Sequence, residues 1–414
     1  MTPSPDGSAD KAPDFDGLRS TCATSGPAAM FESLAASLAR RRRWHALFDA
    51  RMMQARVTLG LPASGDIGQI PAATRDQLDE LSLAACREAG WPLLEEGQIA
   101  NAWMYLRAAT EPAEVANKLA TLAAGLEESN ADDDEEVARR LQELVGVALW
   151  EGVDPALGLA VVLRTQGTCN AITTYEQAVS RLPAARQRPA ASLLVSHLHA
   201  EVAANLAADL ASRGLSVPPA TAAASIVDLL EAAGGLQGDP SIHVDVSHLQ
   251  SVLRIARVCD DEPTLRKAWE LACYGDRLPA DVVYPGEPPF ENVARASRLW
   301  YAAHLGLDVE KAVVFFRKAA VTARIEHAGT LPCDTLVLLL WRIGRPAEAL
   351  HAALERPADD GMPSGMQAAG MLPSLIELAA ASGGWELLRA ACQERGDEIT
   401  FAATLAAEAV GKSR

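Results

Sequence analysis

The sequence has few aromatic residues, few basic residues for its acidity and no long apolar run. Aromatic residues make up 5% of the chain although 49% of it is hydrophobic, so Ala and Leu must supply most of the core. Both residue types favour closely packed helices. The 54 acidic residues against 37 basic ones give a formal net charge of −17. This balance argues against nucleic acid and anionic membranes as main partners, because both require a basic surface.

Signals for export, membrane insertion and well-known catalytic chemistry are also missing. No segment stays apolar for the length of a membrane span, and the first residues lack the basic start and apolar centre of a signal peptide. The seven cysteines are scattered without a CxxC pair, which is typical of a reducing compartment, so we predict a cytoplasmic protein. The P-loop, GxGxxG, HExxH and GxSxG motifs do not occur, and no particular reaction is indicated.

What the sequence does contain is helical periodicity from residue 28 onward. Alternating β-branched runs are almost absent, and Gly and Pro fall between the periodic stretches. An all-α fold is therefore expected. Residues 1–26 are rich in Pro, Gly, Ser and Asp, and we expect this segment to be disordered because it offers little apolar surface to bury. The remainder is expected to form three helical parts, at 27–130, 131–292 and 293–414.

Five stretches share one register, in which an apolar helical run is followed by a short turn and a second helical run. The clearest copy has apolar residues at Cys333, Leu336, Val337 and Leu340, followed by a turn at Gly344 and a small residue at Ala349. The other copies are centred on the following pairs of runs: Phe31 to Leu38 and Trp44 to Leu47; Cys86 to Leu93 and Gly97 to Ala109; Ala296 to Ala303 and Ala312 to Ala319; Leu372 to Ala379 and Gly383 to Trp385.

On these residues the chain resembles the tetratricopeptide-like α-solenoids. The resemblance implies stacked antiparallel helical hairpins that bind a protein partner through a concave surface, without a cofactor. It covers the N-terminal quarter and the C-terminal third, whereas residues 110–290 do not follow the register and are expected to form an irregular helical middle. A compact antiparallel bundle with Ala-rich contacts is the alternative architecture.

The middle of the chain carries the residues that suggest a different function. Half of the eight histidines lie in the two short segments 197–201 and 243–248. His243, Asp245 and His248, with His199, have the side-chain types that bind a divalent transition metal. The alternative for Asp245 is an N-cap of the helical run that follows it, with His248 in the first turn.

A cysteine-dependent site is a second possibility in the same region. Cys169 follows Thr168, a candidate N-cap, and the helix dipole lowers the pKa of a thiol in a first turn. Cys169, His199 and Asn205 have the residue types of a Cys-His-Asn triad, although the spacing matches no known pattern, and a packed thiol is the alternative. Asn170 lies beside the cysteine. A metal-dependent or cysteine-dependent enzyme is therefore the alternative to a scaffold.

A loop rich in proline and glycine ends this central region. Tyr284, Pro285 and Gly286 predict a tight turn, and Pro288 and Pro289 stiffen the chain that follows. Such a loop, with Tyr284 at its start, either binds a peptide or small molecule or serves as a rigid link to the last hairpins.

Overall fold

The computed structural model describes residues 14–128, 135–215, 225–234, 243–326, 329–357 and 365–412. These ranges are helical with connecting turns and contain no strand, so the predicted all-α fold is confirmed. The chain divides into two compact units, Met1–Val161 and Val162–Arg414. The division lies within helix α7, Pro155–Thr174, and therefore inside the segment 131–292 that the sequence analysis treated as one part.

The first unit begins with two helical hairpins, at the positions that the first two repeats predict. Its elements are α1 Phe15–Arg40, α2 Trp44–Thr58, α3 Ala72–Glu95, α4 Ile99–Ala109, α5 Pro112–Glu128, α6 Glu135–Val145 and the π-helix η1 Gly146–Trp150. The α3–α4 pair is packed so closely that a Cβ on Gly90 would lie 2.7 Å from the side chain of Leu106. Glycine at position 90 is therefore required by packing, as a small residue in such a hairpin should be.

The N-terminal segment differs from the expected disorder in residues 15–25. Helix α1 begins at Phe15, and the Asp14 carboxylate accepts a hydrogen bond of 2.8 Å from the backbone N–H of Gly17 at the helix start. Gly26 interrupts the helix with a φ of 86°, which separates this short first segment from the helical run that starts at Pro27. The Asp14 side chain caps the start of this helical segment, and Gly26 ends it. Residues 1–13 lie outside the described residues.

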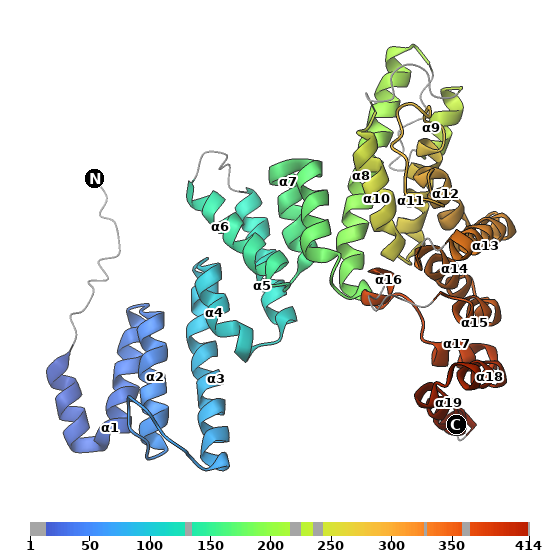
Figure 1. Cartoon of the computed structure of the whole chain (residues 1–414). Helices are drawn as coiled ribbons and strands as arrows, with labels where there is room; N and C mark the ends of the chain where they lie inside the picture. The colour runs from blue at the N-terminus through green and yellow to red at the C-terminus, as the bar shows by residue number, and fades with distance from the viewer. Residues whose placement is uncertain are drawn as a thin grey trace. The chain divides into compact units, whose positions relative to one another are not determined.

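The second unit has a long central helix followed by a succession of shorter ones (Figure 1). Its elements are η2 Tyr175–Val179, α8 Ala184–Ser212, α9 Ile226–Ala232, α10 Val246–Ile255, η4 Ala256–Val258, α11 Glu262–Gly275, α12 Val293–His304, α13 Val309–Glu326, α14 Leu331–Arg342, α15 Pro346–Leu354, α16 Gly365–Ala368, α17 Leu375–Ser382, α18 Trp385–Arg395 and α19 Glu398–Lys412. Helix α8 contacts α9, α10 and α11, and from α11 onward each helix packs on the next as far as α15. The chain then continues through α17 to α19, with α17 packed on α15.

Most of the buried aromatic residues lie in the core of this second unit. Trp300, Tyr274, Tyr301 and Phe316 are the largest fully buried side chains, and they come from α11, α12 and α13. Trp300 and Phe316 meet edge to face with ring centroids 5.8 Å apart, and the Tyr301 hydroxyl donates to the carbonyl of Leu253. This dense aromatic core fixes α12 and α13, on which the groove described below depends. None of the helices among the described residues combines the length and apolarity that crossing a bilayer requires.

Candidate functional site

Helices α13, α14 and α15 form a groove on the second unit. Helix α14 is the middle element, and its residues from Pro332 to Leu340 are all buried because α13 packs on one side and α15 on the other. The turn between α14 and α15 is made by Gly344, whose φ of 76° lies in the left-handed region that glycine tolerates. The tight turn brings the start of α15 back over α14 and leaves a hollow between α13 and α15.

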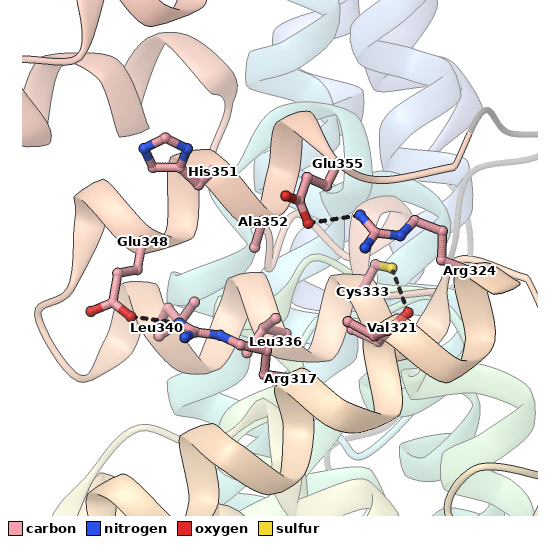
Figure 2. Close-up of a pocket in the computed structure, with 11 residues that line it drawn as sticks. Arg317, Val321, Arg324, Cys333, Leu336, Leu340, Glu348, His351, Ala352 and Glu355 are labelled. Carbon is pink, nitrogen blue, oxygen red and sulfur yellow. Dashed lines mark hydrogen bonds and ion pairs between the residues drawn. The ribbon is translucent and has the colours of Figure 1, made fainter.

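The hollow has a volume of about 500 Å³. Leu336 and Leu340 of α14 form an apolar floor, together with the buried thiol of Cys333 (Figure 2). The Cys333 thiol lies 3.8 Å from the carbonyl oxygen of Ala320, and burial raises the pKa of this thiol. Cys333 therefore contributes apolar surface to the floor and is not set up as a nucleophile.

Two ion pairs join the walls of the groove across α14. Arg317 of α13 donates to Glu348 of α15 over 2.6 Å, and Arg324 donates to Glu355 over 2.7 Å. Partners on each helix are seven residues apart, so the two pairs lie about 10 Å apart along the groove. Figure 2 shows both pairs, with His351 exposed on α15 between the two glutamates.

Some charged side chains of these walls pair with two oppositely charged side chains each. Glu348 also accepts a hydrogen bond from the guanidinium of Arg345, which pairs in turn with Glu310 of α13 over 2.8 Å. Burial acts to raise the pKa of Glu348, but the hydrogen bonds from Arg345 and Arg317 outweigh it and lower the pKa. At physiological pH the Arg and Glu side chains of the walls are therefore ionised, and their opposite charges nearly cancel. The floor between them is apolar.

An exposed apolar stripe runs along α13 beside the groove. Val314, Val321 and Ile325 recur at helical spacing and all are exposed, and Val321 also lines the groove. Val321 is the residue that the groove and the stripe share, and the exposed Lys318 lies between Val314 and Val321.

The central candidate residues do not meet in one place. Each contacts a different partner in the helical core. His199 of α8 contacts Glu270 of α11, with Nε2 and Oε2 2.9 Å apart. The same carboxylate accepts the backbone N–H of Ile226 at the start of α9 over 2.8 Å. Burial acts to raise the pKa of Glu270, but the hydrogen bonds from His199 and from the Ile226 N–H outweigh it and lower the pKa. The contact between His199 and Glu270 thus links α8 to α11, and Glu270 links α11 to α9.

Asn205 and His243 form a second tie between α8 and the chain before α10. The Asn205 amide donates to the carbonyl of His243 over 2.9 Å, and the buried His243 ring lies 3.1 Å from the Tyr274 hydroxyl. Nε2 of His243 is 3.6 Å from the Asp209 carboxylate, which is beyond hydrogen-bond distance. Burial lowers the pKa of His243, and the nearby Asp209 opposes that shift only in part. His243 is therefore a neutral core residue.

The candidate metal site does not assemble from these residues. Asp245 is the N-cap of α10 and accepts from the backbone N–H groups of Ser247 and His248, so the N-cap interpretation is confirmed. The hydrogen bonds from Ser247 lower the pKa of Asp245. His199 and His243 are held by other partners, and across the described ranges no three His, Cys, Asp or Glu side chains converge as metal ligands would.

The cysteine triad does not form either. Cys169 is exposed on α7 just after the kink at Gly167, while His199 and Asn205 are held by Glu270 and His243. Asn170 donates to the carbonyl of Gln166 within the same helix.

A different histidine lies near the cysteine. Nε2 of His197 is 2.9 Å from the Thr168 hydroxyl and 3.7 Å from the Glu201 carboxylate. Both partners lie at the same ring nitrogen, whereas a proton relay needs one partner at each nitrogen.

The proline-rich loop turns later than predicted. The N–H of Phe290 donates to the carbonyl of Glu287 over 2.8 Å, so the turn spans 287–290, with a cis peptide bond between the two prolines, and not 284–286. Gly286 is instead in close contact with this turn, because a Cβ there would lie 2.5 Å from the Phe290 carbonyl. Tyr284 is exposed, and its carbonyl accepts from Gln250.

No family model, curated protein or solved structure matches this chain.

The groove was not predicted as a site, although Cys333, Leu336 and Leu340 of its floor belong to the clearest predicted repeat. A usable signal was present, because Arg317 and Arg324 are seven apart on one predicted helix while Glu348 and Glu355 are seven apart on another. Opposite charges with equal spacing on two helices are able to pair when the helices face each other. The buried Glu270 was also missed, since a single Glu in an apolar helical run gives no indication of its partner.

Proposed function

We propose that the protein is a tetratricopeptide-like helical-repeat scaffold that binds a segment of a partner protein in the groove of α13, α14 and α15. The observation that carries the proposal is the combination of an apolar floor, charged walls and an adjoining exposed apolar stripe on α13. The five helical pairs at the predicted repeat positions support it. The dispersal of the central Cys and His residues into structural contacts weighs against the enzymatic alternative.

The chemistry of the groove indicates what kind of segment binds there. The two Arg–Glu pairs already neutralise each other, so a ligand gains little from net charge of either sign. Binding free energy must come from apolar side chains that contact Val321 and the small exposed part of Leu336, because Leu340 is already fully buried. An amphipathic helix laid along α13 would meet both the floor and the stripe, which is the helix-in-groove mode of recognition.

The proposal is tested by selecting amphipathic peptides from a displayed library on the full-length protein and measuring their affinity by fluorescence anisotropy. Two variants alter the groove without altering the buried core: Val321→Asp places a charge at its exposed edge, and Ala352→Trp fills it. Each should weaken binding at least about tenfold, because a desolvated charge or a blocked pocket removes an apolar anchor. Leu81→Asp, at an exposed position of α3, is the matched control and should bind like the unaltered chain.

Selection that enriches no peptide would contradict the proposal. Peptides that bind the Val321→Asp and Ala352→Trp variants as tightly as they bind the unaltered protein would contradict it as well.

A further inference from the structure

The turn between α1 and α2 is made of four consecutive arginines, residues 40–43. The first lies in the last turn of α1, the second is the C-cap of α1, and the fourth is the N-cap of α2. The N–H of Arg42 donates to the carbonyl of Ala39 over 3.0 Å, and the N–H of Arg43 donates to that of Leu38 over 2.9 Å. These two bonds form a Schellman motif, in which Arg42 occupies the position that needs a positive φ.

The other four predicted repeats have glycine at this position of the turn. The φ lies between 72° and 77° at Gly97, Gly306, Gly344 and Gly383, and it is 56° at Arg42. A side chain in this left-handed region is strained, because its Cβ comes too close to the carbonyl oxygen that follows. The one other non-glycine residue with a positive φ among the described residues is an aspartate, which tolerates this region better. The first hairpin thus keeps a strained arginine where glycine would relieve the strain.

The ion pair of Arg42 does not account for the strained residue. Its Nε lies 2.9 Å from the Glu96 carboxylate, but the Arg42 side chain is 74% exposed, and such a pair contributes little to stability. Glu96 also accepts hydrogen bonds from the Trp44 indole over 2.8 Å and from the Gln98 amide over 3.2 Å. Glycine at position 42 would therefore still leave the Glu96 carboxylate with two partners.

The helix dipoles favour the first two arginines of the turn and disfavour the fourth. The C-terminal end of α1 carries partial negative charge, whereas the N-terminal end of α2 carries partial positive charge. Arg43 is the N-cap of α2, makes no capping hydrogen bond there and is followed by no acidic residue in the first turn. Arg345 has the same position in the α14–α15 hairpin, but it pairs with Glu348 and Glu310. Arg43 pairs with no carboxylate among the described residues.

Three guanidinium charges of the turn have no acidic partner. Arg40, Arg41 and Arg43 form no ion pair within the part of the chain that the structure describes, and the buried Nε of Arg41 has no hydrogen-bond partner there. Arg42 lines a hollow beside the turn, and the three carboxylates of this hollow have cations of their own: Glu95 has Lys118, Glu96 has Arg42, and Glu136 has Arg139 and Arg140. In a chain of net charge −17 the turn is therefore a local excess of positive charge.

We propose that the arginine turn, residues 40–43, binds an acidic segment of a partner protein. Two of its arginines are unfavourable for the fold, and residues that violate local preferences in this way are expected at functional sites. A guanidinium presents paired N–H donors that match the two oxygens of a carboxylate, so successive Asp or Glu side chains can each pair with one arginine. The net charge of −17 disfavours nucleic acid and anionic bilayers, which extend beyond the turn, whereas a short peptide contacts the turn alone.

Fluorescence anisotropy of a labelled peptide of eight glutamates, titrated with the full-length protein at low salt, tests the proposal. A triple variant removes the three unpaired charges by the substitutions Arg40→Gln, Arg41→Gln and Arg43→Gln. It should weaken binding at least about tenfold, because the carboxylates of the peptide lose their partners. Far-ultraviolet circular dichroism verifies that the helices are retained.

A matched control removes the same amount of charge elsewhere. It replaces three exposed arginines that form no ion pair among the described residues, by the substitutions Arg75→Gln, Arg107→Gln and Arg181→Gln. Binding should weaken less than about twofold, because charges far from the bound peptide are screened by salt.

A variant with glycine in the turn separates binding from stability. Arg42→Gly should unfold at an unchanged or higher temperature, because glycine adopts the positive φ without strain. The same variant should weaken binding of the peptide at least about threefold, because one guanidinium is lost. Gly383→Ala introduces a side chain at a φ of 72° with open space around it, and it should unfold at a lower temperature.

Unchanged binding in the triple variant, equal weakening in its control, or no binding up to about 1 mM protein overturns the proposal. A fall in the unfolding temperature of Arg42→Gly overturns it as well, because it would show that this arginine stabilises the turn. Tighter binding of an eight-nucleotide single-stranded DNA, or of vesicles that contain phosphatidylserine, overturns it in favour of those partners if the triple variant abolishes that binding. Peptide binding in the α13–α15 groove is measured separately and does not depend on any of these outcomes.

Discussion

Removing one partner of the buried ion pair between Asp334 and Arg356 should cost far more stability than removing one partner of an exposed pair in the groove. Asp334 of α14 is 0% exposed, and the guanidinium of Arg356, just after α15, reaches both of its carboxylate oxygens, with the shorter contact at 2.6 Å. Arg356→Met keeps the length of the side chain but removes its charge, leaving a buried carboxylate without its cation. The free energy of unfolding should fall by about 3–5 kcal/mol.

Two further variants separate the charge effect from simple loss of packing. Arg317→Met makes the same substitution in a pair whose arginine is 53% exposed, and it should cost less than about 1 kcal/mol. Replacing both partners, as Asp334→Leu with Arg356→Met, should recover most of the lost stability, because no uncompensated charge then remains buried.

Urea unfolding followed by circular dichroism gives the free energies, and amide hydrogen exchange in α14 and α15 shows whether the loss is local. The reasoning is refuted if Arg356→Met costs no more stability than Arg317→Met. It is also refuted if the separate stability losses of Asp334→Leu and Arg356→Met add up to the loss in the double variant.

Four other substitutions test particular contacts. Gly90→Ala should destabilise the chain by about 1–3 kcal/mol in thermal unfolding because its Cβ would overlap Leu106, whereas Gly125→Ala, with open space around it, should stabilise α5 slightly. The pKa of Glu270 is lowered in the folded protein, so the stability that its carboxylate contributes is present above the unfolded pKa and is lost as the pH falls. The Glu270→Gln variant should therefore lose less stability than the unaltered protein between about pH 5 and pH 3. Burial lowers the pKa of His304 to about 4, so stability should fall by about 3 kcal/mol as pH drops from about 6.5 to about 4, and His304→Phe should flatten that dependence in urea titrations.

The His304 prediction has a structural cause that can be stated atom by atom. Its Nδ1 lies 2.8 Å from the Trp300 carbonyl and donates to it, which leaves Nε2 as the atom to be protonated. Nε2 is buried and meets no acceptor among the described residues. The nearby Arg342 guanidinium also disfavours a second positive charge. A rise in stability on acidification would show that an acceptor reaches Nε2 and would contradict this account.

The helical hairpins could be predicted from sequence because their signals are local. Apolar residues at helical spacing, a glycine at the turn and a small residue in the second helix lie within about forty residues of one another. Gly344 and Gly383 both adopt the positive φ that such turns require. Asp245 was predictable as an N-cap for the same reason, since a cap depends on the next three residues alone.

The partners of the central residues could not be predicted in this way. His199 and Glu270 are separated by 71 positions, and their contact depends on how α8 and α11 are rotated about their own axes. A histidine next to an apolar stripe is consistent with a metal ligand, a catalytic base or a structural tie, and only the tertiary arrangement decides among them. The seven-residue spacing of the Arg and Glu residues of the groove is visible in the sequence. That these residues pair depends on α13 and α15 packing on either side of α14, which the sequence does not show.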